Sequence, residues 1–270
     1  MPNGASGDWV SDFFIRHSDW YLPILGSAQM VSEGVQIAQW VDYQVRLIGV
    51  GKARILDVGS GLGRVSIPLG EIGHTVVGVD ISRRFVEEAR RRALERGLGD
   101  KVVFIQGDAR RLKDSVAEYA PFDAAIFIFT SVLGYYDEGT DLEILRQAFD
   151  VVKPGGLLII DVVDKEWGVK VNGRTLVIDV DDAVAVQLVS FDPSTARIRS
   201  RWRYYAKQGG MPTRLRYLGE SMVYVRAYSL GELADLARRA GWVLKGAYSC
   251  FCNEPYIPGF GRLVAVFKRP

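Results

Sequence analysis

The sequence contains few of the residues that cross-link small folds or bind metals. In 270 residues there are two cysteines, Cys250 and Cys252, and two histidines, His17 and His74. The cysteines are too close together to close a useful loop, which excludes a disulfide scaffold. Two thiols and two distant histidines also argue against a zinc site. We therefore expect no metal.

Long apolar runs and a secretory signal are also missing. No apolar stretch approaches the ~18 residues of a membrane span, and the N-terminus lacks a basic segment followed by an apolar core. We expect a cytoplasmic protein with no membrane partner. The net charge of +2 does not by itself indicate nucleic acid. Arginine supplies 25 of the 34 basic residues, a bias reported in some heat-adapted proteins, so a thermophilic source is a further hypothesis.

The order of apolar segments predicts an α/β fold. Residues 1–52 read as amphipathic helices. Short apolar runs then alternate with helical stretches as far as residue 163, the runs being 54–58, 75–79, 101–105, 123–129 and 156–162. This alternation is typical of a doubly wound parallel sheet with helices on both faces. Residues 164–227 are strand-like and rich in turn signals, and the helix–strand pattern returns at 228–270. We predict a helical cap at 1–52, an α/β domain at 53–163 and 228–270, and an antiparallel β insertion at 164–227.

A glycine-rich turn follows the first apolar run. Asp57 lies two residues before the first glycine of this turn, in which Gly59, Gly61 and Gly63 follow the run as G-x-G-x-G. Glycines at this point let a ligand approach the backbone closely. A dinucleotide fingerprint needs its third glycine one residue later, and the Asp57 carboxylate would repel a pyrophosphate while suiting a cationic amino-acid group. The turn therefore favours S-adenosylmethionine as ligand. The alternative is a turn that is merely tight.

Acidic residues also end the second and third apolar runs. Asp80 ends the second, where a carboxylate can accept hydrogen bonds from ribose hydroxyls. Asp108 and Ala109 follow the third, where a carboxylate and a backbone N–H can bind an adenine edge. Each acid alone is more often a helix cap. Their common position at the carboxyl ends of strands favours a ligand site, because open α/β sheets bind ligands there.

With these motifs, residues 53–163 and 229–268 resemble the class I S-adenosylmethionine-dependent methyltransferases. The resemblance implies a seven-stranded sheet whose last strand is antiparallel, and a cofactor that leaves as S-adenosylhomocysteine. It also implies residue roles. Gly59, Ser60, Gly61 and Gly63 would hold the methionine portion, with Asp57 near its ammonium. Asp80 would bind the ribose hydroxyls, with Ile81 against the adenine, and Asp108 and Ala109 would bind the adenine edge. Phe129 and Thr130 would form the floor of the site near the methyl group.

The resemblance does not identify the methyl acceptor. The stretch Phe129-Thr130-Ser131-Val132 stands where enzymes that methylate base amines often carry Asn/Asp-Pro-Pro-Tyr/Phe, which argues against that reaction. On one helix, His17 and Tyr21 would share a face, and N-terminal helices of this family commonly close over the cofactor. Tyr135, Tyr136 and Glu254 fall on segments expected near the pocket rim. These five residues are the catalytic candidates, the alternative being a surface histidine and ordinary structural side chains.

The insertion contains a stripe of arginines. On a strand, Arg197, Arg199, Arg201 and Arg203 would lie on one face, with Ile198, Trp202 and Tyr204 on the other. This face could bind phosphate or RNA. It could instead be a solvated face paired with Asp179, Asp181 and Asp182, which is the interpretation that we favour.

Three functions remain open from the sequence. The first is methyl transfer to an O or N atom of a small molecule beneath a lid formed by the insertion. The second is an RNA or ribonucleoprotein methyltransferase that uses the arginines. The third is a non-catalytic protein that binds the cofactor. The sequence does not fix the oligomeric state.

Overall fold

The larger of two β-sheets carries the predicted α/β domain. The computed structural model describes residues 9–209 and 213–270. Its seven-stranded sheet has the order β10-β11-β5-β4-β1-β2-β3, with β1 Arg54–Val58, β2 Thr75–Asp80, β3 Val102–Gln106, β4 Phe122–Phe127, β5 Val152–Val163, β10 Val243–Tyr248 and β11 Arg262–Lys268. The pairs among β1 to β5 are parallel, and β11 is antiparallel to both of its neighbours. The predicted fold class is confirmed.

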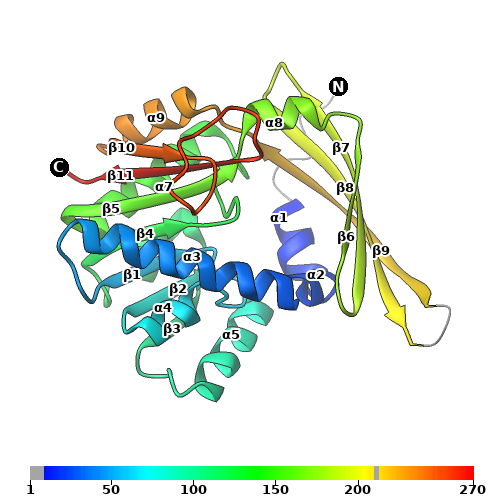
Figure 1. Ribbon diagram of the computed structural model, residues 1–270, viewed down its shortest axis with the longest axis horizontal. Coiled ribbons are helices and arrows are strands. Elements are labelled where there is room, and N and C mark those ends of the chain that lie inside the picture. The colour runs from blue at the N-terminus through cyan, green and yellow to red at the C-terminus, as the bar shows by residue number, and fades with distance from the viewer. Residues whose placement is uncertain (1–8, 210–212) are drawn as a thin grey trace.

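Helices cover both faces of this sheet (Figure 1). One face packs against α3 Ala28–Leu47, α4 Ser66–Ile72 and α5 Arg83–Glu95. The other packs against α6 Leu112–Ser115, α7 Glu138–Val151 and α9 Leu230–Arg239. A short 3₁₀ turn, η2 Ala109–Arg111, precedes α6. Because both faces are covered, the central strands are apolar along nearly their whole length.

The segment from 164 to 227 forms the second sheet, and we call it the lid. After α8 Lys165–Lys170 it runs through β6 Thr175–Asp179, β7 Ala183–Asp192, β8 Arg197–Gln208 and β9 Arg214–Arg226. These four strands pair in sequence order and are all antiparallel. The lid stands beside the edge of the large sheet at which its parallel strands end (Figure 1).

The first described residues fill the space between the lid and the large sheet. They form α1 Trp9–Ser11, the π-helix η1 Asp12–Arg16 and α2 Ser18–Leu25. Phe13, Tyr21 and Ile24 share one apolar cluster with the lid residues Ala185 and Tyr204. The helices of the predicted cap thus pack against two parts of the molecule. Helix α3 covers the large sheet, while α1 and α2 lie against the lid (Figure 1).

The structure also bears on membrane-spanning segments and on the two cysteines. Among the described helices, none combines the length and the apolar composition needed to span a bilayer. A disulfide joins Cys250 to Cys252. It closes a single turn and connects no distant parts of the chain. Glu254 lies near both sulfurs, but sulfurs in a disulfide offer no thiolate to a metal.

Candidate functional site

A cavity of about 620 Å³ lies where the parallel strands end beneath the lid. This volume is within the usual range for sites that enclose a small molecule. A second cavity of about 60 Å³ adjoins it, and the two share the lining residues Phe14, Gly59, Asp80, Ser131 and Tyr135. The two cavities therefore offer one elongated site that follows the ends of β1, β2 and β3.

Most of the predicted site residues line these cavities. In the large one are Asp57, Gly59, Ser60, Gly61, Asp80, Phe129, Thr130, Tyr21 and Tyr135. In the small one are Gly59, Asp80, Ile81, Asp108, Ala109, Tyr135 and Tyr136. Gly63, His17 and Glu254 line neither. The structure thus brings the cofactor candidates together in the order that the strands give them.

The glycine-rich loop is open to the cavity at one position and packed at another. Gly61 has a φ of +54°, and an added Cβ would meet only Leu25 Cδ1, at 3.9 Å. A ligand can therefore lie directly against the backbone there. Gly63 is different, because a Cβ would come within 2.5 Å of Phe104 Cζ. The absence of a side chain at Gly63 thus lets the loop pack onto the sheet, and the predicted contact of Gly63 with the methionine portion stays a prediction.

Asp80 connects the loop to the end of β2. Its Oδ2 accepts a hydrogen bond from Gly61 N at 2.9 Å, and its Oδ1 accepts one from Ser82 N at 2.8 Å. Burial raises the pKa of Asp80 to about 6, and these two N–H groups offset part of that effect. Each oxygen keeps a lone pair for a further donor. Ribose hydroxyls of a bound cofactor could supply those donors.

Asp57 lies at the bottom of the large cavity. Its Oδ2 accepts a hydrogen bond from Ser66 Oγ at 2.6 Å. Burial raises the pKa of Asp57 to about 6, while the Ser66 hydrogen bond and the charge of Arg64 lower it. A nearby ammonium group would favour the ionised form of this carboxyl group. The predicted role of Asp57 is thus physically reasonable and stays a prediction.

Asp108 forms hydrogen bonds and an ion pair within its own chain that the sequence does not indicate. It caps the turn η2 by accepting from Arg110 N at 2.9 Å, and its carboxylate also pairs with the Arg110 side chain. Partial burial raises the pKa of Asp108, but the hydrogen bonds and charge of Arg110 outweigh it and leave the pKa lowered. With Ile81 and Ala109 it lines the small cavity, where a flat adenine ring would lie.

The turn after β4 has an unusual backbone. Phe129, Thr130 and Val132 all have φ between +55° and +68°, a region that costs non-glycine residues about 1–3 kcal/mol each. Asp161, on β5, holds the turn: its Oδ2 accepts from Phe129 N at 2.7 Å and its backbone O accepts from Thr130 N at 2.8 Å. Strained residues fixed by neighbours are typical of functional sites. Here Phe129 and Thr130 line the large cavity, and Val132 lines the small one.

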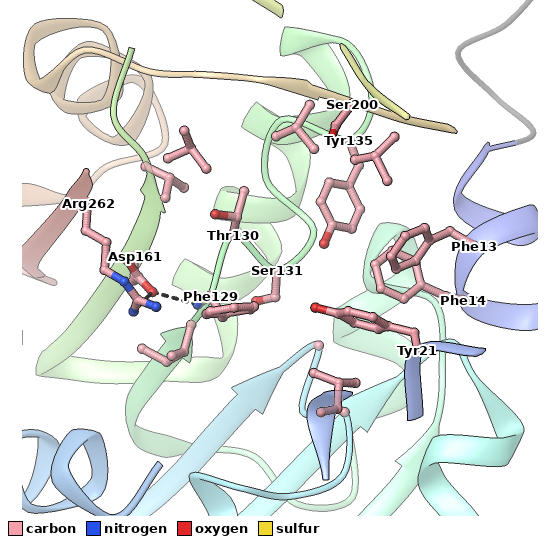
Figure 2. Close-up of a pocket in the computed structure, with 18 of the residues that line it drawn as sticks. Phe13, Phe14, Tyr21, Phe129, Thr130, Ser131, Tyr135, Asp161, Ser200 and Arg262 are labelled. Carbon is pink, nitrogen blue, oxygen red and sulfur yellow. Dashed lines mark hydrogen bonds and ion pairs between the residues drawn. The ribbon is translucent and has the colours of Figure 1, made fainter. Parts of the chain in front are cut away.

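Three tyrosines were catalytic candidates, and the structure distinguishes among them. The hydroxyls of Tyr21 and Tyr135 point into the same space above Phe129 (Figure 2). Burial raises the pKa of Tyr21 to about 12 and raises the pKa of Tyr135 strongly as well. Both are neutral near pH 7, so they can donate hydrogen bonds but cannot act as ready bases. Tyr136 lines only the small cavity.

His17 does not share a helical face with Tyr21, and that expectation is corrected. It lies between η1 and α2 with φ −115° and ψ 22°, so the helix is interrupted there and the i, i+4 spacing does not apply. Its ring stacks on Trp20 at 3.9 Å between centroids. Glu254 is likewise corrected: its side chain is exposed, on a turn that Asn253 fastens to Trp40.

Sequence reasoning missed a group of buried charges on one side of the cavity. Arg262 bridges Asp161 Oδ2 and Glu33 Oε1, at 2.9 Å each, and Arg64 lies 3.3 Å from Glu33 Oε2. Both guanidinium groups lie over the Phe129 ring. The Nη2 atom of Arg64 has no hydrogen-bond partner among the described residues, although its side chain is only 8% exposed.

Arg64 places a positive charge beside the large cavity. Arg64 and Tyr21 both line this cavity; burial raises the pKa of Tyr21, and the charge of Arg64 lowers it by a smaller amount. A carboxylate such as that of S-adenosylmethionine would be attracted by this charge and would accept a hydrogen bond from the Tyr21 hydroxyl. Asp57 suits an ammonium group, and Asp80 suits ribose hydroxyls. With Tyr21 and Arg64 near a carboxylate, these residues match a ligand that carries an ammonium, a carboxylate and a ribose.

The lid forms the ceiling of the large cavity with mostly apolar side chains. They come from all four lid strands: Leu176, Ile178, Val189, Ile198, Trp202, Val223 and Val225, with Gln187 and Ser200 as polar members. The predicted alternation on β8 therefore holds, since Ile198, Ser200 and Trp202 face the cavity. The arginines occupy the other side of that strand.

The expected pairing of those arginines is corrected. Arg203 pairs with Glu220 at 3.3 Å, and Lys207, not an arginine, pairs with Asp179. The strands explain this, because β8 lies between β7 and β9 while Asp179 ends β6. Arg197 donates to the backbone oxygens of Gly134 and Tyr136, so it fastens the lid to the turn after β4.

Comparison with known proteins places the domain in a family. Residues 55–156 match a family model described as a methyltransferase domain. The tRNA 5-carboxymethoxyuridine methyltransferase of Escherichia coli K12 is 30% identical over 125 residues, which are 46% of each chain; the match thus spans about half of that relative. The cypemycin N-terminal methyltransferase of a Streptomyces species is 26% identical over 247 residues, 90% of this chain and 92% of that one.

Solved structures extend the likeness of the fold to the lid. An S-adenosylmethionine-dependent methyltransferase from Clostridium acetobutylicum has a TM-score of 0.77 at 14% identity, over 94% of this chain and 97% of that one. The CcbJ methyltransferase from Streptomyces caelestis has a TM-score of 0.73 at 21% identity, over 88% and 89%. The family match and the fold agree: residues 55–156 match a methyltransferase domain, and the chain has the fold of the S-adenosylmethionine-dependent methyltransferase that it resembles.

Proposed function

We propose that the chain is an S-adenosylmethionine-dependent methyltransferase that transfers the methyl group to an O or N atom of a small molecule. The observation that carries this proposal is the large cavity, which extends from the glycine-rich loop to the apolar ceiling of the lid. It offers space beyond the residues expected to hold the cofactor. A protein that only bound the cofactor would need no such space.

The residues that would do this work are of two kinds. Asp80, Asp57 and Arg64 would fix the ribose and the methionine portion, while the lid would enclose the acceptor and exclude water. Bound S-adenosylmethionine would supply a methyl group on a sulfur that is already a good leaving group. The protein therefore needs mainly to align and desolvate the two reactants.

The relatives are compatible with this acceptor class. One curated relative that matches over most of both chains is a cypemycin N-terminal methyltransferase. The match to the tRNA methyltransferase covers less than half of either chain. We therefore rank an RNA acceptor below a small molecule.

A substitution in the lid tests the proposal. Ser200 lies on β8 and lines the cavity, so Ser200→Phe should fill acceptor space while leaving the cofactor residues intact. We expect unchanged affinity for S-adenosylhomocysteine and loss of at least about tenfold in S-adenosylhomocysteine production from S-adenosylmethionine with a panel of small amines and alcohols. Arg199→Phe, on the outer side of the same strand, is the matched control and should keep activity. Turnover with total RNA but with no member of the panel would contradict the proposal.

A further inference from the structure

Three carboxylates line the large cavity, and two of them belong to the cofactor side. Asp57 lies one residue before the end of β1 and Asp80 ends β2, both next to the glycine-rich loop. Asp57 accepts a hydrogen bond from Ser66 Oγ, and Asp80 accepts one from Gly61 N. Asp161 is the third. It lies on β5, on the side of the cavity toward α8 and the lid, and it was not a candidate from the sequence.

The hydrogen bonds of Asp161 are all on one oxygen. Its Oδ2 accepts from Phe129 N at 2.7 Å and from Arg262 Nη1 at 2.9 Å. No described residue donates a hydrogen bond to Oδ1, and protein atoms do not fully enclose this oxygen. Oδ1 therefore meets the open space of the cavity. A carboxylate oxygen in this position is free to accept an N–H or O–H from a bound molecule.

The neighbours of Asp161 keep it in place. Burial raises the pKa of Asp161, and the charges of Arg262 and Arg64 and the Phe129 N–H offset only part of this effect. Arg262 is in turn held by Glu33. Figure 2 shows the Asp161–Arg262 pair at one end of the cavity, with Phe129 and Thr130 between it and the two tyrosine hydroxyls.

We propose that Asp161 positions the methyl acceptor, by taking a hydrogen bond from the nucleophilic group through Oδ1, and that this group is an amine on a largely apolar molecule. This inference rests on the proposed function. The apolar part of the acceptor would lie against the lid ceiling, and its amine would point to the end of β5.

The charge balance of the reaction favours an amine. The nitrogen lone pair forms a bond to the methyl carbon, and the carbon–sulfur bond breaks with its electron pair remaining on sulfur. Positive charge thus moves from sulfur to nitrogen, and the extra proton on nitrogen leaves to solvent afterwards. A fixed carboxylate beside the nitrogen stabilises this developing charge more than it stabilises the neutral amine.

Binding of two cofactor analogues tests this role without knowledge of the acceptor. Sinefungin carries a cationic amine where S-adenosylmethionine carries its methyl group, whereas S-adenosylhomocysteine carries nothing there. We would measure both affinities by calorimetry for the unmutated protein and for Asp161→Asn, which keeps an oxygen for Phe129 N. We expect Asp161→Asn to weaken sinefungin binding by about tenfold or more and S-adenosylhomocysteine binding by less than about threefold.

Asp123→Asn is the matched control. Asp123 also carries a basic partner, Lys153, but lies at the start of β4, at the opposite edge of the sheet, so its variant should bind both analogues normally. Equal loss of both analogues in Asp161→Asn would overturn the proposal by showing a structural role, and so would the absence of any change. Failure of the unmutated protein to bind S-adenosylhomocysteine would instead contradict the proposed function itself.

Discussion

Asp80 illustrates how one residue can hold the protein and a ligand at the same time. Its two oxygens already accept the N–H groups of Gly61 and Ser82, which fixes the loop relative to β2. A carboxylate has about four lone-pair positions, so two remain for the ribose. Burial without a ligand raises the pKa of Asp80 to about 6, and donors from a ribose would lower it again.

This pKa predicts how cofactor binding depends on pH. Above about pH 6 the Asp80 carboxyl group is ionised and ready to accept, so the affinity for S-adenosylhomocysteine should be constant. Below about pH 6 binding must first remove a proton, so the affinity should fall as the pH falls. Calorimetry between pH 5 and 8 measures this. Asp80→Asn should lose about tenfold or more at pH 7.5 and should show a shallower pH dependence, the remainder arising from Asp57. Unchanged affinity in Asp80→Asn would contradict the ribose assignment.

Some site residues could be predicted from the sequence because local rules place them. Asp57 and Asp80 lie at or next to the ends of apolar runs, and parallel strands bring their carboxyl ends to one edge. Asp161 and Arg262 could not be found this way, since their contacts join β5, β11 and α3 and depend on tertiary packing. His17 was misplaced because no local pattern of residues predicts the break between η1 and α2.

At the scale of elements, β8 carries two different surfaces. Ile198, Ser200 and Trp202 face the cavity, while Arg199 lies exposed on the other side and contacts the Tyr224 ring. The alternation was predictable from the period of two along a strand. The partners of the arginines were not, because they depend on which strands are neighbours in the sheet.

The outer arginines lead to a prediction about RNA. Arg199 contacts the Tyr224 ring on the outer side of β8, and neither Arg199 nor Arg201 lines the cavity. Arg199→Gln/Arg201→Gln should therefore change activity little. If these arginines instead held phosphates, each lost contact would reduce the salt slope of RNA affinity by about one unit. We expect weak binding of total RNA and equal slopes for both proteins, measured at several salt concentrations. Tight RNA binding that the double variant loses would favour the RNA hypothesis.

At the scale of the whole molecule, the site arises where separate apolar clusters meet. Two clusters lie on the two faces of the large sheet, and a third joins α1 and α2 to the lid. The large sheet and the lid boundaries were predictable because continuous apolar runs and turn signals are local in sequence. The volume between them was not, since it depends on how the lid docks, for example through Arg197 on the turn after β4.

The central claim is that a small acceptor lies beneath the lid, beside the reactive sulfur of the cofactor. A crystal structure of the protein with S-adenosylhomocysteine tests it most directly. We predict that the ribose contacts Asp80 and that the sulfur faces open space bounded by Thr130, Asp161 and the apolar side of β8. A sulfur that faces closely packed protein, with no room for an acceptor between it and the lid, would contradict the account.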